Sequence, residues 1–235
     1  MNTMNRNGSY FYPMEGAVDL QSIMRQVYTW MVLGLLVTTV VAYLTATSAI
    51  LINLAANPII LLVAILAEFG LVLGISAGLN RLSSGVATML FILYAALNGF
   101  TLSFVLLAFT GASLFLAFAT TAALFGVMSV IGYTTRVDLS KMGTYLMMAV
   151  IGLVIAMVVN IFVGSGPLDT IISVAGVLIF TALTAYDTQR IGRMAAQMNV
   201  NGDSEVKFGI FGALKLYLDF INMFLFVLRL TGRRR

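Results

Sequence analysis

The chain of 235 residues contains no cysteine, no histidine and few charged residues. The lack of cysteine excludes disulfide bonds, thiol catalysis and thiolate-bound zinc or iron–sulfur sites. The lack of histidine means that a group titrating near neutral pH would have to be a carboxylate in an unusual environment. Charged residues make up 9% of the chain and hydrophobic residues 60%, whereas soluble proteins carry about 25% charge. The composition therefore indicates an integral membrane protein.

The abundant feature is a series of long apolar runs, most of them close to the roughly 20 residues that cross about 30 Å of hydrocarbon. We expect seven transmembrane helices, at about residues 27–49, 58–79, 86–109, 113–133, 143–163, 171–186 and 208–228. The predicted fold is thus an all-α membrane bundle. Its domain division is a cytosolic N-terminal tail (1–26), a membrane domain (27–230) and a basic C-terminal tail (231–235).

Basic residues favour one side of the membrane. Lys and Arg occur in the N-terminal tail and in the second, fourth and sixth connections, whereas the alternate connections contain none. This pattern predicts a cytoplasmic N-terminus. The arginines at the C-terminus oppose the pattern if the last run spans, so a re-entrant last segment is an alternative; we favour spanning because the run is long and contains no proline. The basic residues are scattered between apolar runs, so we expect no nucleic-acid partner.

A polar stripe interrupts the last apolar run. Lys215, Asp219, Asn222 and Arg229 fall on one helix face at 100° per residue, with Phe226 between them. An ionised group at the bilayer centre costs roughly 2.5–3.5 kcal/mol even on the lenient insertion scale. We therefore expect this face to contact protein or water rather than lipid.

Three acids lie within or at the ends of apolar runs, namely Glu68, Asp187 and Asp219. Local ion pairs are one interpretation, Asp187 with Arg190 and Asp219 with Lys215. Glu68 has no basic residue within a helical turn, so it is protonated, bonded to another helix or exposed to water. If Asp187 and Asp219 approach each other, both cannot ionise cheaply and they would share a proton. Such a pair predicts a pH-sensing switch between two helix arrangements.

Two C-terminal segments carry a family resemblance. GVLIFTALTAYDTQR at 176–190 and GALKLYLDFINMFLFVLRL at 212–230, together with GYTTRVDLS at 132–140, resemble the bacterial inner-membrane branch of the transmembrane Bax inhibitor motif family. The resemblance covers essentially the whole hydrophobic chain. It implies two three-helix layers around a central C-terminal helix.

The resemblance also implies a function and its residues. The expected activity is a pH-sensitive calcium leak governed by a hydrogen-bonded Asp187–Asp219 pair. Glu68 matches a family acid, and Arg81 is the nearest match to an arginine that latches the closed state, although its spacing differs by a couple of residues. With Asn222 and Lys215, Glu68 is a candidate for the ion pathway.

Calcium prefers several oxygen ligands, and Asp187 and Asp219 would provide only a weak, transient metal site. We therefore expect no resident cofactor, with calcium as the permeant ion, and no enzymatic activity. The expected partners are the lipid bilayer, calcium and protons.

Two other functions fit parts of the sequence. A regulatory partner of membrane proteins, for example of a membrane quality-control protease, would act through residues 1–26. An intramembrane aspartyl protease is suggested by Tyr186-Asp187, but Asp219 lacks the glycine-flanked context of the second catalytic acid.

Overall fold

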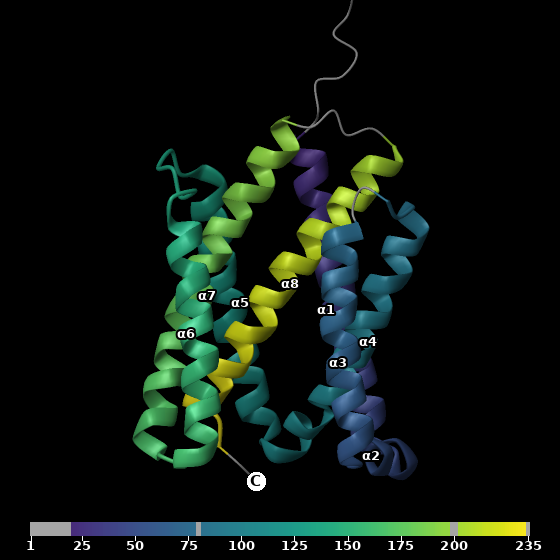
Figure 1. Cartoon of the computed structure of the whole chain (residues 1–235), viewed down its shortest axis with the longest axis vertical. Helices are drawn as coiled ribbons and strands as arrows, with labels where there is room; N and C mark the ends of the chain where they lie inside the picture. Colours follow the sequence, from purple (N-terminus) through teal and green to yellow (C-terminus); the bar gives the residue numbers. More distant parts are fainter. Residues whose placement is uncertain (1–19, 79–80, 198–201, 234–235) are drawn as a thin grey trace, which may run out of the picture.

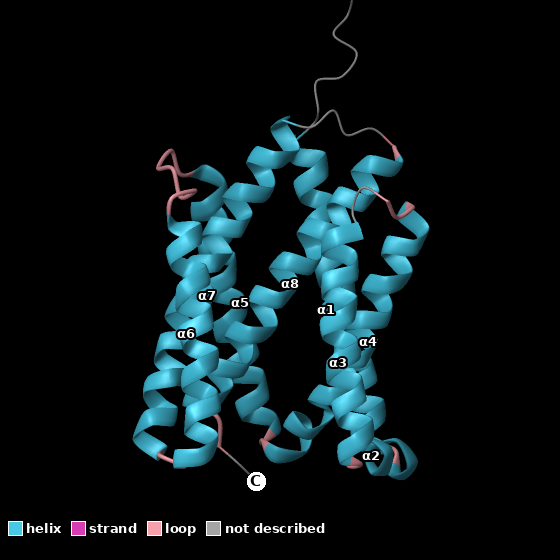
Figure 2. Ribbon diagram, in the orientation of Figure 1, coloured by secondary structure: helices cyan, strands magenta, loops and turns pink. Residues whose placement is uncertain are grey.

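The computed structural model describes residues 20–78, 81–197 and 202–233, which are almost entirely helical (Figure 2). These ranges contain eight helices, and seven of them are long and apolar enough to cross a membrane. The helices are α1 (Leu20–Thr47), α2 (Ala49–Ala55), α3 (Pro58–Gly78), α4 (Ser84–Ala108), α5 (Gly111–Thr134), α6 (Met142–Val163), α7 (Gly166–Gln197) and α8 (Asp203–Thr231). The predicted all-α bundle with seven membrane spans is confirmed.

The bundle consists of two three-helix layers separated by α8. One layer contains α1, α3 and α4, and the other contains α5, α6 and α7, while α8 crosses obliquely between them (Figure 1). About 67% of the apolar window of α8 is buried, compared with 11% in both α3 and α6. The predicted central C-terminal helix is therefore confirmed. α8 is one continuous helix that begins at the end of the bundle where α1 begins and ends at the other (Figure 1).

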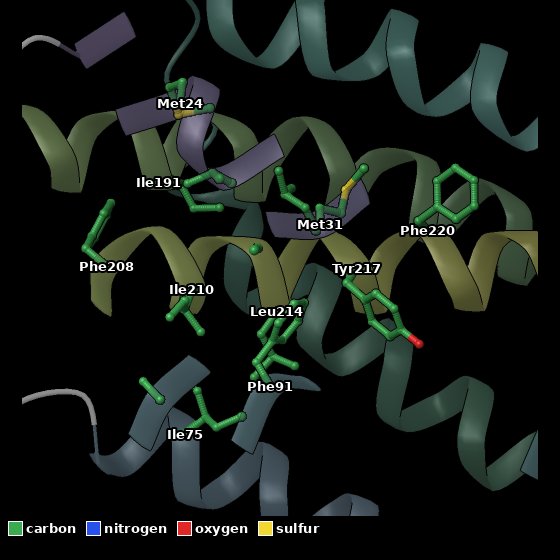
Figure 3. Close-up of a cluster of buried hydrophobic side chains, with 14 of the residues drawn as sticks. Met24, Met31, Ile75, Phe91, Ile191, Phe208, Ile210, Leu214, Tyr217 and Phe220 are labelled. Atoms are coloured by element: carbon green, nitrogen blue, oxygen red, sulfur yellow. The ribbon is translucent and has the colours of Figure 1, made fainter. Parts of the chain in front are cut away.

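Two cores form along the length of α8. Its first half, from Phe208 to Ile221, packs mainly with α1, α3, α4 and α7, and Figure 3 shows Leu214 beside Phe91 of α4. Its second half, including Met223 and Phe226, packs with α5, α6 and α7. The oblique crossing lets one helix complete the core of both layers.

Close contacts within each layer depend on glycine. At Gly99 of α4 an added Cβ would collide with the backbone of Thr38 in α1. At Gly132 of α5 it would collide with the backbone of Ala185 in α7. Small residues at such positions allow helices to approach closely in a membrane, where packing drives association.

Several helix ends differ from the hydropathy-based prediction. α1 begins at Leu20, so residues 20–26 of the predicted tail are helical, whereas residues 1–19 lie outside the described residues. α7 continues to Gln197 rather than ending near 186, and α8 begins at Asp203. The apolar signal ends at the membrane boundary, but helix-forming polar residues extend both helices beyond it. The short α2 was not predicted; Ser48 caps its first turn.

Candidate functional site

Asp187 and Asp219 lie on α7 and α8, which pack against each other. Their exposed fractions are 5% and 4%, so both carboxyl groups are inside the bundle. Asp187 is ten residues before the end of α7, not at a helix end as expected from the apolar run. The structure therefore brings both acids into the helix pair that was predicted to hold them.

The counterion of Asp187 is Lys215 of α8, whose Nζ lies 3.9 Å from Asp187 Oδ2. The Lys215 ammonium also lies 6.0 Å from the ring centroid of Phe211, one turn earlier in α8. Neither local pair considered above forms a salt bridge among the described residues, although Arg190 still acts electrostatically on Asp187. Arg190 instead donates a hydrogen bond to Tyr186 Oη at 3.3 Å.

Asp219 is less well satisfied than Asp187. Its Oδ2 is buried and has no hydrogen-bond partner in the described part of the chain. The carboxylate lies within electrostatic range of both Asp187 and Lys215. Within the described residues no hydrogen bond joins the two aspartates. We name Asp187, Asp219 and Lys215 the aspartate cluster. With all three groups ionised, it has two negative charges and one positive charge, and a single proton makes it neutral.

The polar stripe of α8 faces protein, as expected. Phe226 stacks on Phe180 of α7 at a centroid distance of 5.9 Å, and Arg229 pairs with Asp169 of α7 at 3.3 Å. Asn222 donates to the Leu218 carbonyl in its own helix at 2.8 Å. The stripe is therefore a contact between α8 and α7, and within the described ranges Asn222 contributes no hydrogen bond to another helix.

Glu68 lies in a second polar cluster, between α3 and α4. Its carboxylate accepts hydrogen bonds from Thr101 Oγ1 at 2.8 Å and from Asn98 Nδ2 at 3.4 Å. Tyr217 of α8 donates to Asn98 Oδ1 at 3.1 Å and shares a 2.6 Å hydrogen bond with Thr38 of α1. Of the three states considered for Glu68, the structure has the one bonded to another helix. We name Glu68, Thr101, Asn98, Tyr217 and Thr38 the Glu68 network.

The latch candidate, Arg81, lies apart from both clusters. It is exposed in the connection after α3, where its backbone N–H donates to the Gly78 carbonyl. Among the described residues it forms no ion pair. The structure thus does not bring Arg81 to either aspartate.

A cavity of about 360 Å³ opens at the end of the bundle where α7 finishes, and Asp187 is not among the residues that line it. Thr188, Gln189 and Arg193 line it, and the buried Thr188 hydroxyl has no partner within the described ranges. The connection between α5 and α6 is fixed to the same part of α7. Gln189 accepts from Leu139 N–H at 2.9 Å and donates to the Val137 carbonyl at 2.8 Å.

Arg193 also binds this connection, through Asp138 and Ser140. Asp138 lies outside the membrane-spanning helices, and its pKa is lowered to about 2, first by the Ser140 backbone N–H and then by Arg193. We name Asp138, Ser140, Gln189 and Arg193 the loop clamp. It ties the α5–α6 connection to the helix that holds Asp187.

A tightly coordinated metal centre is not evident in the part of the chain described. There, no three Asp, Glu, Cys or His side chains group closely enough to hold a metal ion. Calcium ions in proteins take 6–8 oxygen ligands, more than the two carboxyl groups of Asp187 and Asp219 can offer.

Sequence reasoning missed three contributors. Tyr217 and Asn98 each stand inside an apolar run, and their polar side chains were a usable signal. Gln189 is a polar residue that gives a similar signal, about one helical turn beyond the end of the apolar run at residues 171–186. Their partners lie at least 30 residues away in the chain, so a single sequence could not have paired them.

Comparison with known proteins gives consistent matches over the chain. The model of the family described as "Inhibitor of apoptosis-promoting Bax1" matches residues 20–235. The inner membrane protein YbhL of Escherichia coli is 46% identical over 237 residues, covering 100% of both chains. Uncharacterized proteins of Borreliella burgdorferi and Rickettsia prowazekii are 45% and 38% identical, covering 89% and 92% of this chain and 91% of each relative.

Proposed function

The chain belongs to the family of the inhibitor of apoptosis-promoting Bax1, and on this premise we propose that it is a pH-sensitive cation leak, with calcium as the permeant ion. One observation carries the proposal. Asp219 is buried in the bundle, and one of its carboxylate oxygens has no hydrogen-bond partner among the described residues. It lies within electrostatic range of Asp187, which pairs with Lys215. No catalytic step is part of this function.

The charge of the aspartate cluster explains how a proton would act on the helices. Isolated net charge is costly inside a membrane protein, so the packed arrangement of α7 and α8 is most stable when the cluster is neutral. One proton on Asp219 achieves neutrality. Loss of that proton leaves one uncompensated negative charge, which changes the balance between the present packing and a state open to cations or water.

The environment of the aspartate cluster fits a leak better than a storage site. Its two carboxylates contribute few oxygen ligands, and Lys215 repels a divalent cation. A permeant ion must be able to leave, so weak binding is what conduction requires. The cavity lined by Thr188 and Gln189 is the proposed entrance at the end where α7 finishes. By the distribution of Lys and Arg, this end is the cytoplasmic side in the proposed orientation.

The geometry gives less support to an intramembrane aspartyl protease. Such an enzyme activates water with two carboxylates that share a proton. Here the Lys215 ammonium contacts Asp187, and this contact stabilises the ionised carboxylate. The proposed regulatory role for the N-terminal tail concerns residues that lie mostly outside the described ones, and it stays a prediction.

Calcium flux into proteoliposomes at several pH values tests the leak. We expect flux in the wild type that changes with pH, and flux in Asp219→Asn that no longer does, because the amide cannot exchange the proton. Glu205→Gln is the matched control, since this acid lies in the first turn of α8 outside the aspartate cluster and should preserve the wild-type response. An unaltered pH response in Asp219→Asn contradicts the proposed gate; the absence of flux in wild type contradicts the leak itself.

A further inference from the structure

A cavity of about 760 Å³ lies between α1 and α5, on a side of the bundle where the two layers do not pack tightly. α1 packs mainly against α4 and α8, and α5 against α7 and α8. The cavity is lined by residues 21–28 of α1 and 125–134 of α5, so it lies near the beginning of α1 and the end of α5. It is separate from the aspartate cluster and from the Glu68 network.

The walls of the cavity combine one positive charge with hydroxyl groups and apolar side chains. Arg25 is exposed at its rim and has no acidic partner among the described residues. Tyr28 of α1 and Tyr133 of α5 also line it. Phe125 provides an apolar wall and packs against Phe220 of α8 at a centroid distance of 5.5 Å. This combination fits an amphipathic molecule with an anionic head.

A buried hydroxyl in the same wall also lacks a partner. Ser129 is 7% exposed, and its Oγ makes no hydrogen bond within the described ranges. A serine in a helix commonly donates to the carbonyl four residues earlier, and Thr134 does so in the same helix at 2.7 Å. The unused hydroxyl of Ser129 is therefore an independent indication that a ligand or bound polar group completes this wall.

The depth of the cavity matches the boundary between headgroups and acyl chains. α1 has 28 residues, which gives a length of roughly 42 Å at 1.5 Å per residue, against about 30 Å of hydrocarbon. An upright α1 centred in the bilayer would extend about 6 Å into the headgroup region at each end. Arg25 lies five residues into the helix, about 7.5 Å from its beginning. Tyrosine rings are also favoured at this depth.

We propose that this cavity binds an anionic phospholipid of the surrounding leaflet. The Arg25 guanidinium would hold the phosphate, because its fork of N–H groups matches phosphate oxygens and no carboxylate of the described residues pairs with it. Ser129, Tyr28 and Tyr133 would provide hydroxyl contacts to the head. One acyl chain would continue along the exposed apolar surface of α5, at Val127, Val130 and Ile131. A soluble phosphate would leave that apolar surface uncovered.

Native mass spectrometry of the full chain in detergent, with phosphatidylglycerol or phosphatidylcholine added, tests the site. We expect retention of one phosphatidylglycerol in preference to phosphatidylcholine. Arg25→Gln should weaken phosphatidylglycerol binding at least about tenfold, since hydrogen bonds to charged groups are among the strongest. The matched control is Arg136→Gln, which removes an exposed arginine at the same end of the bundle but outside the cavity.

A second variant separates the loss of the site from a loss of folding. Gly126 lines the cavity, and an added Cβ there meets nothing within 4 Å. Gly126→Leu should therefore fill the cavity without disturbing the helices, lower phosphatidylglycerol binding and keep the melting temperature of the wild type. Equal retention of the two lipids, or binding that neither variant changes, overturns the proposal.

Two further experiments identify the molecule that binds in the cavity. Soluble glycerol phosphate at the same concentration should not displace the lipid; if it does, the site binds a free phosphate. A photo-crosslinking residue at position 130 should yield a lipid adduct in membranes. An adduct with residues 1–19 of the same chain instead would show that the N-terminal segment covers the cavity, and the lipid proposal would fail.

Discussion

The Glu68 network and the aspartate cluster both place acidic side chains between helices, but they satisfy them differently. Both oxygens of Glu68 accept hydrogen bonds from neutral groups of α4, and Tyr217 connects the network to α8 and α1. In the aspartate cluster, Asp187 is paired with Lys215, and one oxygen of Asp219 has no hydrogen-bond partner in the described part of the chain.

This difference separates a structural element from a responsive one. A fully hydrogen-bonded network of mostly neutral groups fixes the relative positions of its helices, because any rearrangement would leave several polar groups without hydrogen bonds. The aspartate cluster has three ionisable groups, and one Asp219 oxygen has no hydrogen-bond partner among the described residues. We therefore expect its protonated and deprotonated states to have comparable free energies. We therefore expect the layer of α1, α3 and α4 to act as a fixed frame, against which α7 and α8 rearrange.

Lys215→Met should break the aspartate cluster most strongly. It removes the cation and leaves Asp187 buried and unpaired, which should lower the free energy of unfolding by about 3 kcal/mol, the low end for a broken buried pair because Lys215 stays 29% exposed. Protonation of the unpaired Asp187 carboxylate reduces this loss of stability. The loss should therefore be larger at pH 8 than at pH 5 in thermal unfolding of the purified protein.

Lys207→Met provides the control for that comparison. Lys207 pairs with Asp203 in the same helix at 3.2 Å, a shorter distance than in the aspartate cluster, but the Asp203 side chain is 55% exposed. Exposed pairs contribute little because water screens them. If both variants lost the same stability, or if the Lys215→Met loss were equal at the two pH values, the aspartate cluster would be an ordinary surface ion pair.

Tyr217→Phe should give a smaller loss with a different signature. Removing the hydroxyl leaves Asn98 Oδ1 without its donor inside the bundle and should cost about 1–2 kcal/mol. The two groups that exchange this hydrogen bond are neutral, so the loss should be nearly the same at pH 5 and pH 8. A loss that depends on pH as strongly as that of Lys215→Met would contradict the distinction between a fixed frame and a responsive pair.

Apolar length was sufficient for the seven membrane spans, and the stripe of α8 was visible from spacing alone. The two layers around a central helix were expected from the family resemblance. The sequence also located both aspartates. It could not choose the partner of Lys215, because the local spacing of four residues to Asp219 and the contact with Asp187 across helices are equally compatible with the pattern. Only the packing of α7 against α8 decides between them.

The sequence could not identify the hydrogen-bond partners of Glu68 either. Glu68 has no charged neighbour in sequence, and three outcomes were open. The donors that satisfy it come from α4, about 30 residues later, and the tyrosine that extends the network is on α8, 149 residues away. Which neutral side chains face a buried acid depends on helix rotation, which hydropathy does not encode.

Asp138→Asn should produce the smallest effect, confined to the loop clamp. The pKa of Asp138 is about 2 in the folded protein, below the usual value near 3.9, so its contribution is fully present above the unfolded value and is lost as pH falls toward 2. Between pH 5 and 8 the variant should therefore show a constant, small increase in amide hydrogen exchange in residues 136–141. Gln189 still holds this connection through two backbone contacts, which limits the change. An exchange rate that varied with pH beyond the intrinsic chemical rate would mean that the clamp senses the protonation of Asp187 or Asp219, and that the α5–α6 connection takes part in the proposed switch.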